Sequence, residues 1–321
     1  MVPRRLLECV DKSIVEDAQV ELYGSSCNGF GMVHSDLDIS LTFQGSEDGK
    51  DFSHKETIFD LARHLRKHGS LQEIKAIPWA KVPIVKFTHK GTGLEGDISL
   101  YNTMALHNTR LLKTYSELDE RVRILGYTFK HFAKKCDIND ASKGSLSSYA
   151  YILLTLYYLQ QCNPPVIPVL QELYPEDEQK PEVMVDGCNT WFYDRTGDVC
   201  FVWKEFGSNC QSVGQLWLGL LKFYSEEFNF RDHVVSIRQK AIVTKDQKGW
   251  SRHCIAIEDP FELGRNLGKG VSEKVGAHIM STLQRGYSLF RKPMLECPPE
   301  YNSFAEYFFS KENLAKASAR T

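Results

Sequence analysis

Two aspartates one residue apart interrupt an otherwise apolar segment of this chain, Asp36-Leu37-Asp38-Ile39. Aspartate is depleted in β-strands, so its presence here needs a physical reason. Side chains alternate between the faces of a strand, which places Asp36 and Asp38 on one face and Leu37, Ile39 and Leu41 on the other. Like charges this close repel each other unless a cation lies between them. The segment therefore predicts a strand whose polar face binds metal.

A third aspartate, Asp97, lies in a second strand-like segment, Leu94 to Tyr101, where it shares a face with Ser99. If the two strands are neighbours in one sheet, the three carboxylates converge on a patch that suits two divalent cations about 3.5 to 4 Å apart. Mg²⁺ fits such a ligand set, with Mn²⁺ as an alternative, because it takes a few carboxylates and fills its other positions with water and phosphate oxygens. We therefore predict Asp36, Asp38 and Asp97 as metal ligands and as the catalytic residues.

A glycine-serine turn stands ten residues before the paired aspartates and follows a short predicted strand, Val20 to Tyr23. A turn of this kind at the start of a helix presents N–H groups and hydroxyls to an anion. We therefore expect Gly24 and Ser25, with Ser26, to hold a triphosphate. Neither the Gly-Ser pair nor the Asp-x-Asp pair alone is a specific signal of a phosphate and metal site. Their combination with a third aspartate in a strand is a specific signal.

The bulk composition argues against several classes of protein. The nine cysteines are odd in number and form no Cys-x-x-Cys pair, which argues against a disulfide framework and against a zinc site. A formal net charge of −2 is unlike that of proteins that bind nucleic acid by electrostatics alone. No apolar run has the length of a membrane span, and the N-terminal residues read as an amphipathic helix rather than a signal peptide. We expect a cytoplasmic protein without membrane association.

The periodicity of the chain changes after Asn102 from mixed α/β to helical. Before it, a helix is expected from a Ser53/Glu56 capping box to Gly69, and an exposed loop over 45–51. A strand from Lys81 to His89 joins the next strand through a hairpin at 91–93. After it, helices are expected at Leu118 to Cys136, Ser145 to Cys162, Ser212 to Phe228, Ser272 to Gly286 and Phe304 to Ala317. We predict an α/β unit and a mostly helical unit with a cleft between them.

Five stretches resemble the DNA polymerase β-like nucleotidyltransferase superfamily, and within it the RNA terminal uridylyltransferases and related cytoplasmic poly(A) polymerase-like enzymes. They are YGSSCNGFGMVHSDLDIS, GDISLYNTMALHNTRLL, GSLSSYAYILLTLYYLQQCNPPVIPVLQ, SVGQLWLGLLKFY and IEDPFELGRNLG. The chain is most similar to the catalytic module of the zinc-knuckle-containing uridylyltransferases, although these residues contain no knuckle. The resemblance implies an α+β fold: a palm domain with a mixed sheet over 19–105, and a mostly helical, poly(A) polymerase-associated central domain over 1–18 and 106–321. A nucleotide-recognition motif is expected near 255–270.

The same resemblance implies a template-independent enzyme that transfers UMP from UTP to single-stranded RNA 3′ ends by a two-metal mechanism, in RNA decay and small-RNA metabolism. A monomer is expected, with a protein recruiter or flanking domains that select the RNA. Two alternatives remain: a cytoplasmic poly(A) polymerase that uses ATP, and an inactive module that binds RNA or protein. The second is disfavoured because inactive relatives typically lose a metal-binding acid, and this chain keeps all three.

Several residues resemble those that bind the nucleotide in this family. Lys130 and Lys134 share a helix face, which pattern alone leaves open between a phosphate site and a solvated surface. The resemblance assigns them to the triphosphate, with Ser148. It places Tyr149 on the base, although a core aromatic is the alternative. Asn108, with Thr109 beside it, resembles the residue that contacts the ribose 2′-hydroxyl and a base carbonyl.

Base choice is expected to depend on Asp259, Glu262 and Arg265. Many uridylyltransferases have a histidine at the position of Arg265, and that histidine is associated with a preference for uridine. A guanidinium only donates hydrogen bonds, so it matches the uracil O4 acceptor and opposes the adenine amino group. We therefore predict that Arg265 maintains uridine preference. Asp259 and Glu262 would orient Arg265 or bond the base through water; alternatively, Asp259-Pro260 is only a turn and Glu262 a surface residue.

Overall fold

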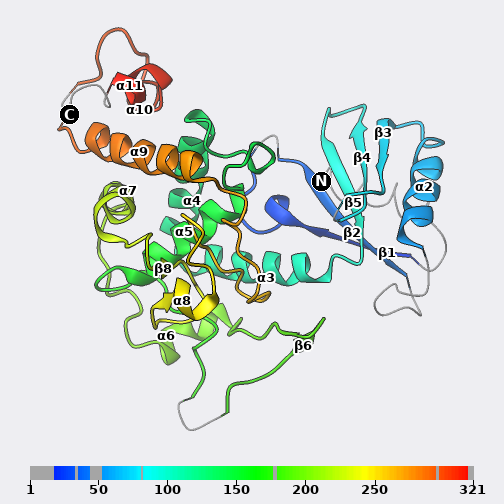
Figure 1. Cartoon of the computed structure of the whole chain (residues 1–321), viewed down its shortest axis with the longest axis horizontal. Coiled ribbons are helices and arrows are strands. Elements are labelled where there is room, and N and C mark those ends of the chain that lie inside the picture. The colour runs from blue at the N-terminus through cyan, green and yellow to red at the C-terminus, as the bar shows by residue number, and fades with distance from the viewer. Residues whose placement is uncertain are drawn as a thin grey trace. The chain divides into compact units, whose positions relative to one another are not determined.

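The computed structural model describes residues 18–32, 35–43, 53–80, 82–175, 179–293 and 296–316. The amphipathic helix expected near the N-terminus and the loop expected over 45–51 lie outside the described residues. The chain divides into two compact units. Unit 1 comprises residues 1–117 and 184–190, and unit 2 comprises residues 118–183 and 191–321 (Figure 1).

Unit 1 is built on a five-stranded mixed sheet with the strand order β1-β2-β5-β4-β3. β2 and β5 are parallel, and the other neighbouring pairs are antiparallel. The strands are β1 (Ala18–Tyr23), β2 (Leu37–Phe43), β3 (Leu71–Ile77), β4 (Ile84–His89) and β5 (Glu95–Leu100). The strands that carry Asp38 and Asp97 are therefore neighbours, as the three-carboxylate hypothesis requires.

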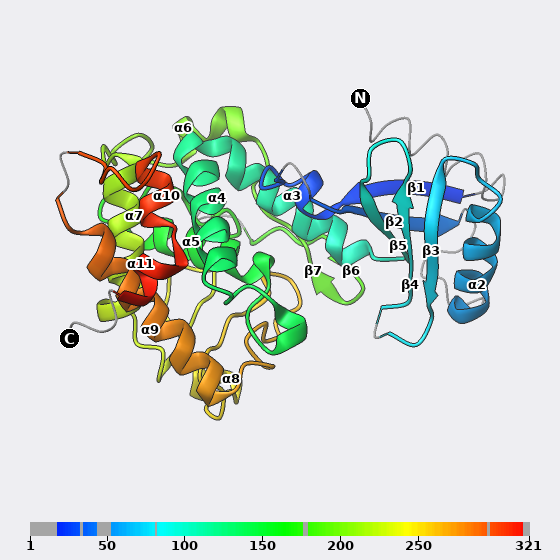
Figure 2. The ribbon, with the colours of Figure 1, turned by 90° about the horizontal axis from the view of Figure 1, so that it is seen from above.

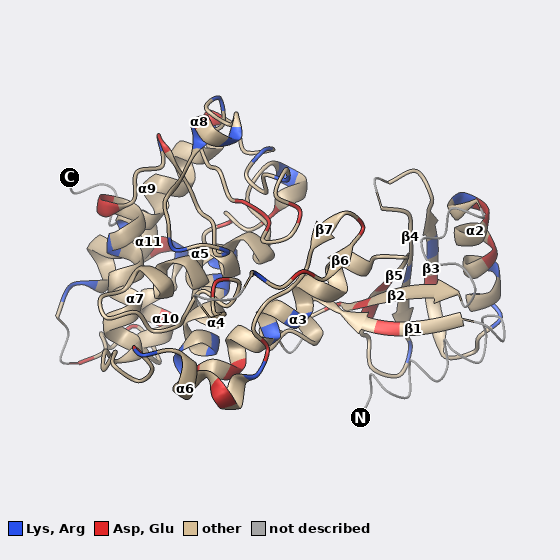
Figure 3. Ribbon diagram, turned by 90° about the horizontal axis from the view of Figure 1, so that it is seen from below, with Lys and Arg blue, Asp and Glu red and all other residues tan. Residues whose placement is uncertain are grey.

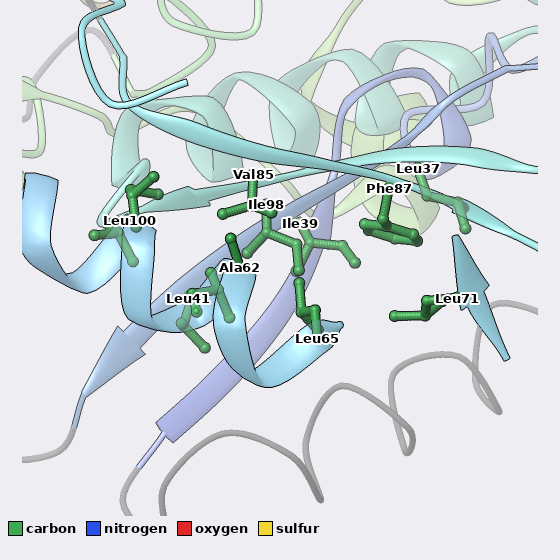
Figure 4. Close-up of a cluster of buried hydrophobic side chains, with 12 residues drawn as sticks. Leu37, Ile39, Leu41, Ala62, Leu65, Leu71, Val85, Phe87, Ile98 and Leu100 are labelled. Carbon is green, nitrogen blue, oxygen red and sulfur yellow. The ribbon is translucent and has the colours of Figure 1, made fainter. Parts of the chain in front are cut away.

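One face of this sheet packs against α2 (His54–Leu65), which begins where the Ser53 hydroxyl accepts a hydrogen bond from the Glu56 N–H. Figure 4 shows apolar side chains of the sheet gathered against Ala62 and Leu65. Burying each large apolar side chain contributes roughly 1.5 to 3 kcal/mol to folding. Because this core takes alternate residues of β2, Asp38 points to the opposite face of the sheet.

Two further elements of unit 1 follow the sheet. α3 (Thr103–Leu118) begins directly after β5. β6 (Met184–Val185) and β7 (Cys188–Asn189) form a hairpin whose turn residues, Asp186 and Gly187, have φ angles of 49° and 75°. The Thr103 hydroxyl donates a hydrogen bond to the Asp186 carboxylate, so the hairpin is tied to the first turn of α3.

Unit 2 is mostly helical (Figure 2). Its longer helices are α4 (Glu120–Lys135), α5 (Ser148–Gln161), α7 (Val213–Lys222) and α9 (Glu273–Phe290). The short helices are α6 (Val199–Val202), α8 (Lys245–Lys248), α10 (Phe304–Phe308) and α11 (Lys311–Lys316), and β8 (His233–Val234) pairs with β9 (Val243–Thr244). In the described ranges, no helix combines the length and the apolar character needed to cross a membrane.

The core of unit 2 surrounds α5, whose residues from Ala150 to Gln160 are all buried. The ring of Phe129 on α4 packs edge-on against Tyr151 and Trp217, at centroid distances of 5.0 and 6.0 Å. Such aromatic pairs add roughly 0.5 to 1.5 kcal/mol beyond their buried area. The Tyr151 hydroxyl also donates to the carbonyl of Ile138 at 2.7 Å, so the first turn of α5 is held rigidly.

The structure differs from the predicted elements at several places. Neither β3 nor α3 is predicted from the sequence. For β3 the reason is that the strand is half-exposed and its apolar and polar residues do not alternate clearly. The helix after Ser53 ends at Leu65 rather than at Gly69, since the chain must already turn to enter β3. The helix expected over 304–317 is two helices, because Ser310 caps a new helix by accepting the Asn313 N–H at 3.1 Å. The predicted domain boundary at 105 and 106 falls inside α3, whereas the compact units divide at 117 and 118.

Candidate active site

A row of polar side chains crosses the sheet of unit 1 on the face opposite α2. Tyr23 pairs with Asp38, Asp38 with Asp97, and Asp97 with Lys86, on β1, β2, β5 and β4. Directly paired residues point to the same face of a sheet, so these four side chains form one line. Figure 3 marks the acidic and basic positions of these strands. Asp36 lies just before β2 and is exposed, so it precedes the strand in which it was expected.

Asp38 carries the most perturbed carboxylate of this row. The pKa of Asp38 is raised to about 6, first by burial and then by the negative charges of Asp97 and Asp36, while Lys86 opposes the shift. Repulsion between neighbouring acids disfavours the ionised form until a cation compensates it. The Asp38 carboxylate is therefore placed where it would bind a cation strongly.

Lys86 is the member of the row that the sequence analysis missed. Its ammonium nitrogen lies 3.0 and 2.9 Å from the two carboxylate oxygens of Asp97. The hydrogen bond to Asp97 is the main cause that raises the pKa of Lys86. A lysine inside the apolar strand segment Ile84-Val85-Lys86-Phe87 is the signal that would have identified it. Lys86 thus neutralises one of the acids that repel Asp38.

Gly24 supports Asp38 from the end of β1. Its φ angle is +73°, and a Cβ atom at this position would lie 2.0 Å from Oδ2 of Asp38. Only glycine fits both conditions. The Gly24 N–H donates to the Thr109 hydroxyl at 2.8 Å, and that hydroxyl donates to the carbonyl of Ala105 at 2.7 Å. Gly24 and Thr109 therefore shape the site, and the predicted anion cradle would have to use Ser25 and Ser26 of the 3₁₀ turn η1 (Gly24–Ser26).

Asn108 on α3 presents a buried acceptor that the described protein atoms leave unsatisfied. Its side chain is 9% exposed, and its amide oxygen has no hydrogen-bond partner among the described residues. A buried acceptor without a partner costs about 1 to 3 kcal/mol. This arrangement fits a ligand that donates a hydrogen bond, and a ribose hydroxyl is such a donor.

The carboxylates of unit 1 do not form a finished metal site by themselves. Within the described ranges, no three His, Cys, Asp or Glu side chains are grouped closely enough to hold an ion. Lys86 donates hydrogen bonds to both carboxylate oxygens of Asp97, and Asp36 lies just before β2. The donors nevertheless suit a hard divalent cation, because all are carboxylates and Asp38 and Asp97 are adjacent across two parallel strands. A cation here would remove the repulsion that raises the pKa of Asp38.

In unit 2, the two predicted phosphate lysines lie on α4 with different burial. Lys130 is buried, at 6% exposure, and Lys134 lies one turn further along. Burial lowers the pKa of Lys130, and the charge of Lys134 lowers it further. A buried ammonium beside a second one is stabilised by an anion. This observation favours the phosphate-site interpretation over a solvated basic surface.

Ser148 and Tyr149 begin α5, as predicted for the phosphate and base contacts. The Ser147 hydroxyl caps the helix by accepting the Ala150 N–H at 3.2 Å. Ser148 Oγ lies 3.0 Å from the amide nitrogen and 3.3 Å from the amide oxygen of Asn139, a partner that the sequence analysis missed. Asn139 precedes the helix that Ser148 begins and follows no regular spacing with it, so only the fold reveals the pair.

Residues 259–265 form a closed loop in unit 2. The Asp259 N–H donates to the Arg265 carbonyl at 3.1 Å, and the Arg265 N–H donates to the Glu262 carbonyl at 2.8 Å. The Asp259 carboxylate is fully buried and accepts the N–H groups of Phe261 and Glu262, each at 3.1 Å. Asp259 and Glu262 are therefore integral parts of the loop.

Two side chains connect this loop to its surroundings. Arg265 Nη1 lies 2.6 Å from Glu262 and 3.8 Å from Asp259, and the Arg265 side chain is 47% exposed. The Tyr149 hydroxyl lies 3.5 Å from Asp259. Burial raises the pKa of Asp259, opposed by the two N–H donors and by Arg265. The structure thus brings Tyr149, Asp259, Glu262 and Arg265 together, with the acids holding the guanidinium in place.

Two family models match the sequence of this chain. One, described as the central palm domain of a mitochondrial-like poly(A) RNA polymerase, matches residues 1–117. The other, described as Cid1 family poly A polymerase, matches residues 212–265. The first contains the whole aspartate row, and the second ends at Arg265.

A comparison with solved structures decides the family. A crystal structure of the Cid1 poly(U) polymerase matches with a TM-score of 0.81 and 31% sequence identity, over 96% of this chain and 92% of that chain. The chain belongs to the Cid1 family of terminal nucleotidyltransferases. Another Cid1 structure, in complex with the UTP analogue UMPNPP, matches this Cid1-family chain with a TM-score of 0.80 and 30% identity, over 96% and 90% of the two chains. The predicted α+β nucleotidyltransferase fold is confirmed.

Sequence relatives place this Cid1-family chain beside both uridylyl and adenylyl transferases. It is 52% identical to human terminal uridylyltransferase 7 over 313 residues, and 53% identical to mouse terminal uridylyltransferase 4 over 305 residues. These matches cover 98% and 95% of this chain but only 21% and 18% of the relatives. Mouse poly(A) RNA polymerase GLD2 is 37% identical over 260 residues, which cover 79% of this chain and 52% of that protein. The chain spans about a fifth of the uridylyltransferases that it matches.

Proposed function

We propose that this chain is the catalytic module of an RNA 3′-terminal uridylyltransferase that transfers UMP from UTP to single-stranded RNA ends without a template. The observation that carries the proposal is the direct pairing of Asp38 and Asp97 across two parallel strands, in a chain of the Cid1 family. Paired carboxylates at this position suit phosphoryl transfer. The identity of about 52% to a terminal uridylyltransferase supports UTP as the nucleotide.

Asp36, Asp38 and Asp97 would hold Mg²⁺, with Mn²⁺ as an alternative. When bound, these ions supply charge neutralisation for an in-line displacement at phosphorus. The chain's own residues then have separate tasks. Asp97 stands beside Lys86 at the centre of the sheet, where its carboxylate would orient the RNA 3′-hydroxyl and accept its proton. Gly24 keeps Asp38 in position because any larger residue would collide with its carboxylate.

Several of the predicted side chains would contact the nucleotide. Ser25, Lys130, Lys134 and Ser148 would contact the triphosphate. Asn108 would bond the ribose through the amide oxygen that lacks a described partner. Tyr149 would stack on the base, which gives affinity without selectivity.

Uridine preference would come from Arg265. Its guanidinium is fixed by Glu262 and Asp259 but remains about half exposed, so further donors are available to a ligand. Guanidinium N–H groups can donate to the uracil O4. They cannot bond the amino group on the corresponding edge of adenine, because that group is also a donor. The relatives that use ATP, such as poly(A) RNA polymerase GLD2, make adenylation the second candidate function.

Further proposals concern the oligomeric state, the location and the RNA partner of the chain. We propose a monomer that works in the cytoplasm, binds single-stranded RNA 3′ ends and depends on a protein recruiter or flanking domains to select them. The near-neutral net charge supports a need for a recruiter, because the chain lacks the excess of basic residues found in proteins that bind RNA by electrostatics alone.

A primer-extension assay tests the proposal. Labelled single-stranded RNA is incubated with Mg²⁺ and each of the four ribonucleotides in separate reactions. We expect tailing with UTP, weak tailing with ATP and none for Asp97→Ala. Asp60→Asn, which alters an exposed acid paired with Arg63 on α2, serves as the matched control and should behave as wild type. Efficient ATP use would favour the adenylation alternative, and no tailing with any nucleotide would contradict both.

A further inference from the structure

A fully buried carboxylate, Glu258, stands at the base of the 259–265 loop. Three groups contact it: the Ser236 hydroxyl at 2.6 Å, Arg238 Nε at 2.8 Å and Lys248 Nζ at 2.6 Å. Its side chain is 0% exposed. Buried charges are rare in proteins and persist where they are paired. Two cations on one buried anion therefore form an ionic cluster directly beside the loop that carries Asp259 and Arg265.

Lys248 differs from the other members of this cluster because it also holds the far side of the loop. Its Nζ donates a hydrogen bond to the backbone carbonyl of Leu263 at 2.6 Å. Its contact with Glu258 is an ion pair, since Oε1 of Glu258 accepts no directed hydrogen bond among the described residues. One ammonium group therefore connects the base of the loop at Glu258 to the far side of the loop at Leu263. Removing it would leave the loop closed only by contacts within the loop itself, those of its backbone and of the Asp259 and Arg265 side chains.

Lys248 is itself held in a fixed position. It ends α8, whose start is a capping box between Thr244 and Gln247 and whose end is Gly249 with a φ angle of 68°. The ammonium lies 5.0 Å from the ring centre of Trp250, and that ring belongs to a small core with Val234, Val243 and Ala256. The side chain is only 18% exposed. A compact, three-donor ammonium suits two acceptors in different directions, which a planar guanidinium would not match.

We propose that Lys248 is a positioning residue for base selection, acting as a strut that fixes the geometry of the 259–265 loop through Glu258 and Leu263. The inference rests on the proposed function, because that loop presents Asp259, Glu262 and Arg265 to the base. Positions near a reacting centre must be held within about 0.5 Å to act selectively. Loss of the strut loosens the loop, so it weakens nucleotide binding and narrows the difference between UTP and ATP.

The chain offers a matched control for this proposal. Lys248→Met keeps the apolar stem over Trp250 and removes the donors to both Glu258 and Leu263. Arg238→Met removes a cation from the same carboxylate but leaves the bond to Leu263 intact. Both variants disturb the buried ion cluster, so both should lower the melting temperature by a similar amount. Only Lys248→Met should alter base selection.

The experiment measures kcat and KM for UTP and for ATP on a single-stranded RNA primer, together with the melting temperature. For Lys248→Met we expect KM for UTP to rise about tenfold with a smaller change in kcat, since one charged hydrogen bond is lost. The ratio of kcat/KM for UTP over ATP should fall, while Arg238→Met keeps the wild-type ratio. Lys248→Gln, which retains a hydrogen-bond donor, should have a KM for UTP between those of wild type and Lys248→Met. An unchanged ratio in Lys248→Met would overturn the proposal.

A second readout separates this inference from the proposed function. Amide hydrogen exchange of Asp259 and Arg265, whose N–H groups close the loop, reports loop order without any turnover. Faster exchange in Lys248→Met than in Arg238→Met supports the strut even if the wild-type chain transfers no uridylate. Equal exchange in the two variants contradicts the strut even if the enzyme tails RNA with UTP.

Discussion

Asp38 of unit 1 and Asp259 of unit 2 are both shielded carboxylates whose pKa burial raises, yet their surroundings are opposite. The pKa of Asp38 is raised to about 6 by burial together with two further acids that it faces, Asp97 and Asp36. Asp259 accepts two backbone N–H groups and lies near Arg265, which oppose the effect of burial. The first acid is left in need of a cation, and the second is already satisfied by its own loop. Unit 1 therefore requires a ligand to complete it, whereas unit 2 presents a finished surface.

This difference suits the aspartate row of unit 1 to catalysis and the 259–265 loop of unit 2 to base recognition. A group that repels its neighbours in the free protein gains most when a charged ligand arrives. A group that its own backbone stabilises holds a fixed geometry for contacts that discriminate between ligands. Substitutions in the aspartate row should therefore change rate and metal response, and substitutions in the loop should change base preference.

The largest effect is expected from Asp38→Asn on the rate. Asparagine keeps the shape of the side chain but removes the negative charge that would attract a cation. We expect the rate of UMP transfer to fall at least about a thousandfold, comparable to the loss of a major electrostatic contribution at an active site. Single-turnover primer extension with saturating UTP measures it. A fall of less than tenfold would show that Asp38 does not belong to the catalytic set.

The same variant should have the opposite effect on the stability of the metal-free protein. Because the folded-state pKa of Asp38 lies above its usual value near 3.8, protonation stabilises the fold at low pH, and that contribution is lost as pH rises through about 6. At pH 8 in EDTA, Asp38→Asn should therefore be more stable than wild type, by on the order of 1 to 3 kcal/mol. The gap should narrow steadily as the pH falls from about 6 towards the ordinary aspartate pKa near 3.8.

Thermal unfolding over pH 4.5 to 8 measures this gap, and Mg²⁺ supplies the internal control. Added Mg²⁺ should raise the melting temperature of wild type more than that of Asp38→Asn, because an ion that binds only the folded state stabilises it by mass action. A variant that is less stable than wild type at pH 8 without metal would contradict the description of Asp38 as an acid in need of a cation.

Unit 1 was largely predictable from the sequence, because its signal is local. The alternation around Leu37 and Ile39 predicts the strand, and the position of Asp97 in a second apolar segment predicts its partner. Lys86 and the pairing with Tyr23 were missed because strand order and register depend on contacts distant in the sequence. Gly24 was predicted as an anion donor, and only the approach of Asp38 reveals why the position must be glycine.

The site residues of unit 2 were predictable mainly through the family resemblance. Pattern alone left Lys130 open between a surface and a phosphate site, and its burial supports the second interpretation. Neither Asn139 beside Ser148 nor the Glu258 cluster has a local sequence signal, since the paired residues follow no helix or strand spacing. Polar pairs of this kind emerge only once the loops between the helices are packed.

An effect of intermediate size is expected from Arg265→Ala. The loss of the fixed guanidinium removes a donor to the uracil O4, so the ratio of kcat/KM for UTP over ATP should fall about tenfold. Steady-state tailing with each nucleotide measures the ratio. Arg252→Ala, which removes an exposed arginine outside the loop, is the control and should leave it unchanged. An unaltered ratio in Arg265→Ala would remove the assigned role.

The smallest effect is expected from Tyr149→Phe. The hydroxyl is 3.5 Å from Asp259, a weak contact, so KM for UTP should rise only a few-fold and stability should change by less than about 1 kcal/mol. Tyr149→Leu should raise KM much further, because the ring itself would stack on the base. Nucleotide titration of the initial rate distinguishes the two. Equal effects of both substitutions would show that the hydroxyl, rather than the ring, makes the contact.

The composition of tails made from a mixture of UTP and ATP tests uridine preference most directly. Wild-type protein is given single-stranded RNA, Mg²⁺ and equal concentrations of UTP and ATP, and the products are sequenced. We expect tails composed predominantly of uridine, with a larger adenosine share in Arg265→Ala. Wild-type tails composed mainly of adenosine would contradict this expectation and identify the chain as an adenylyl transferase on the same scaffold.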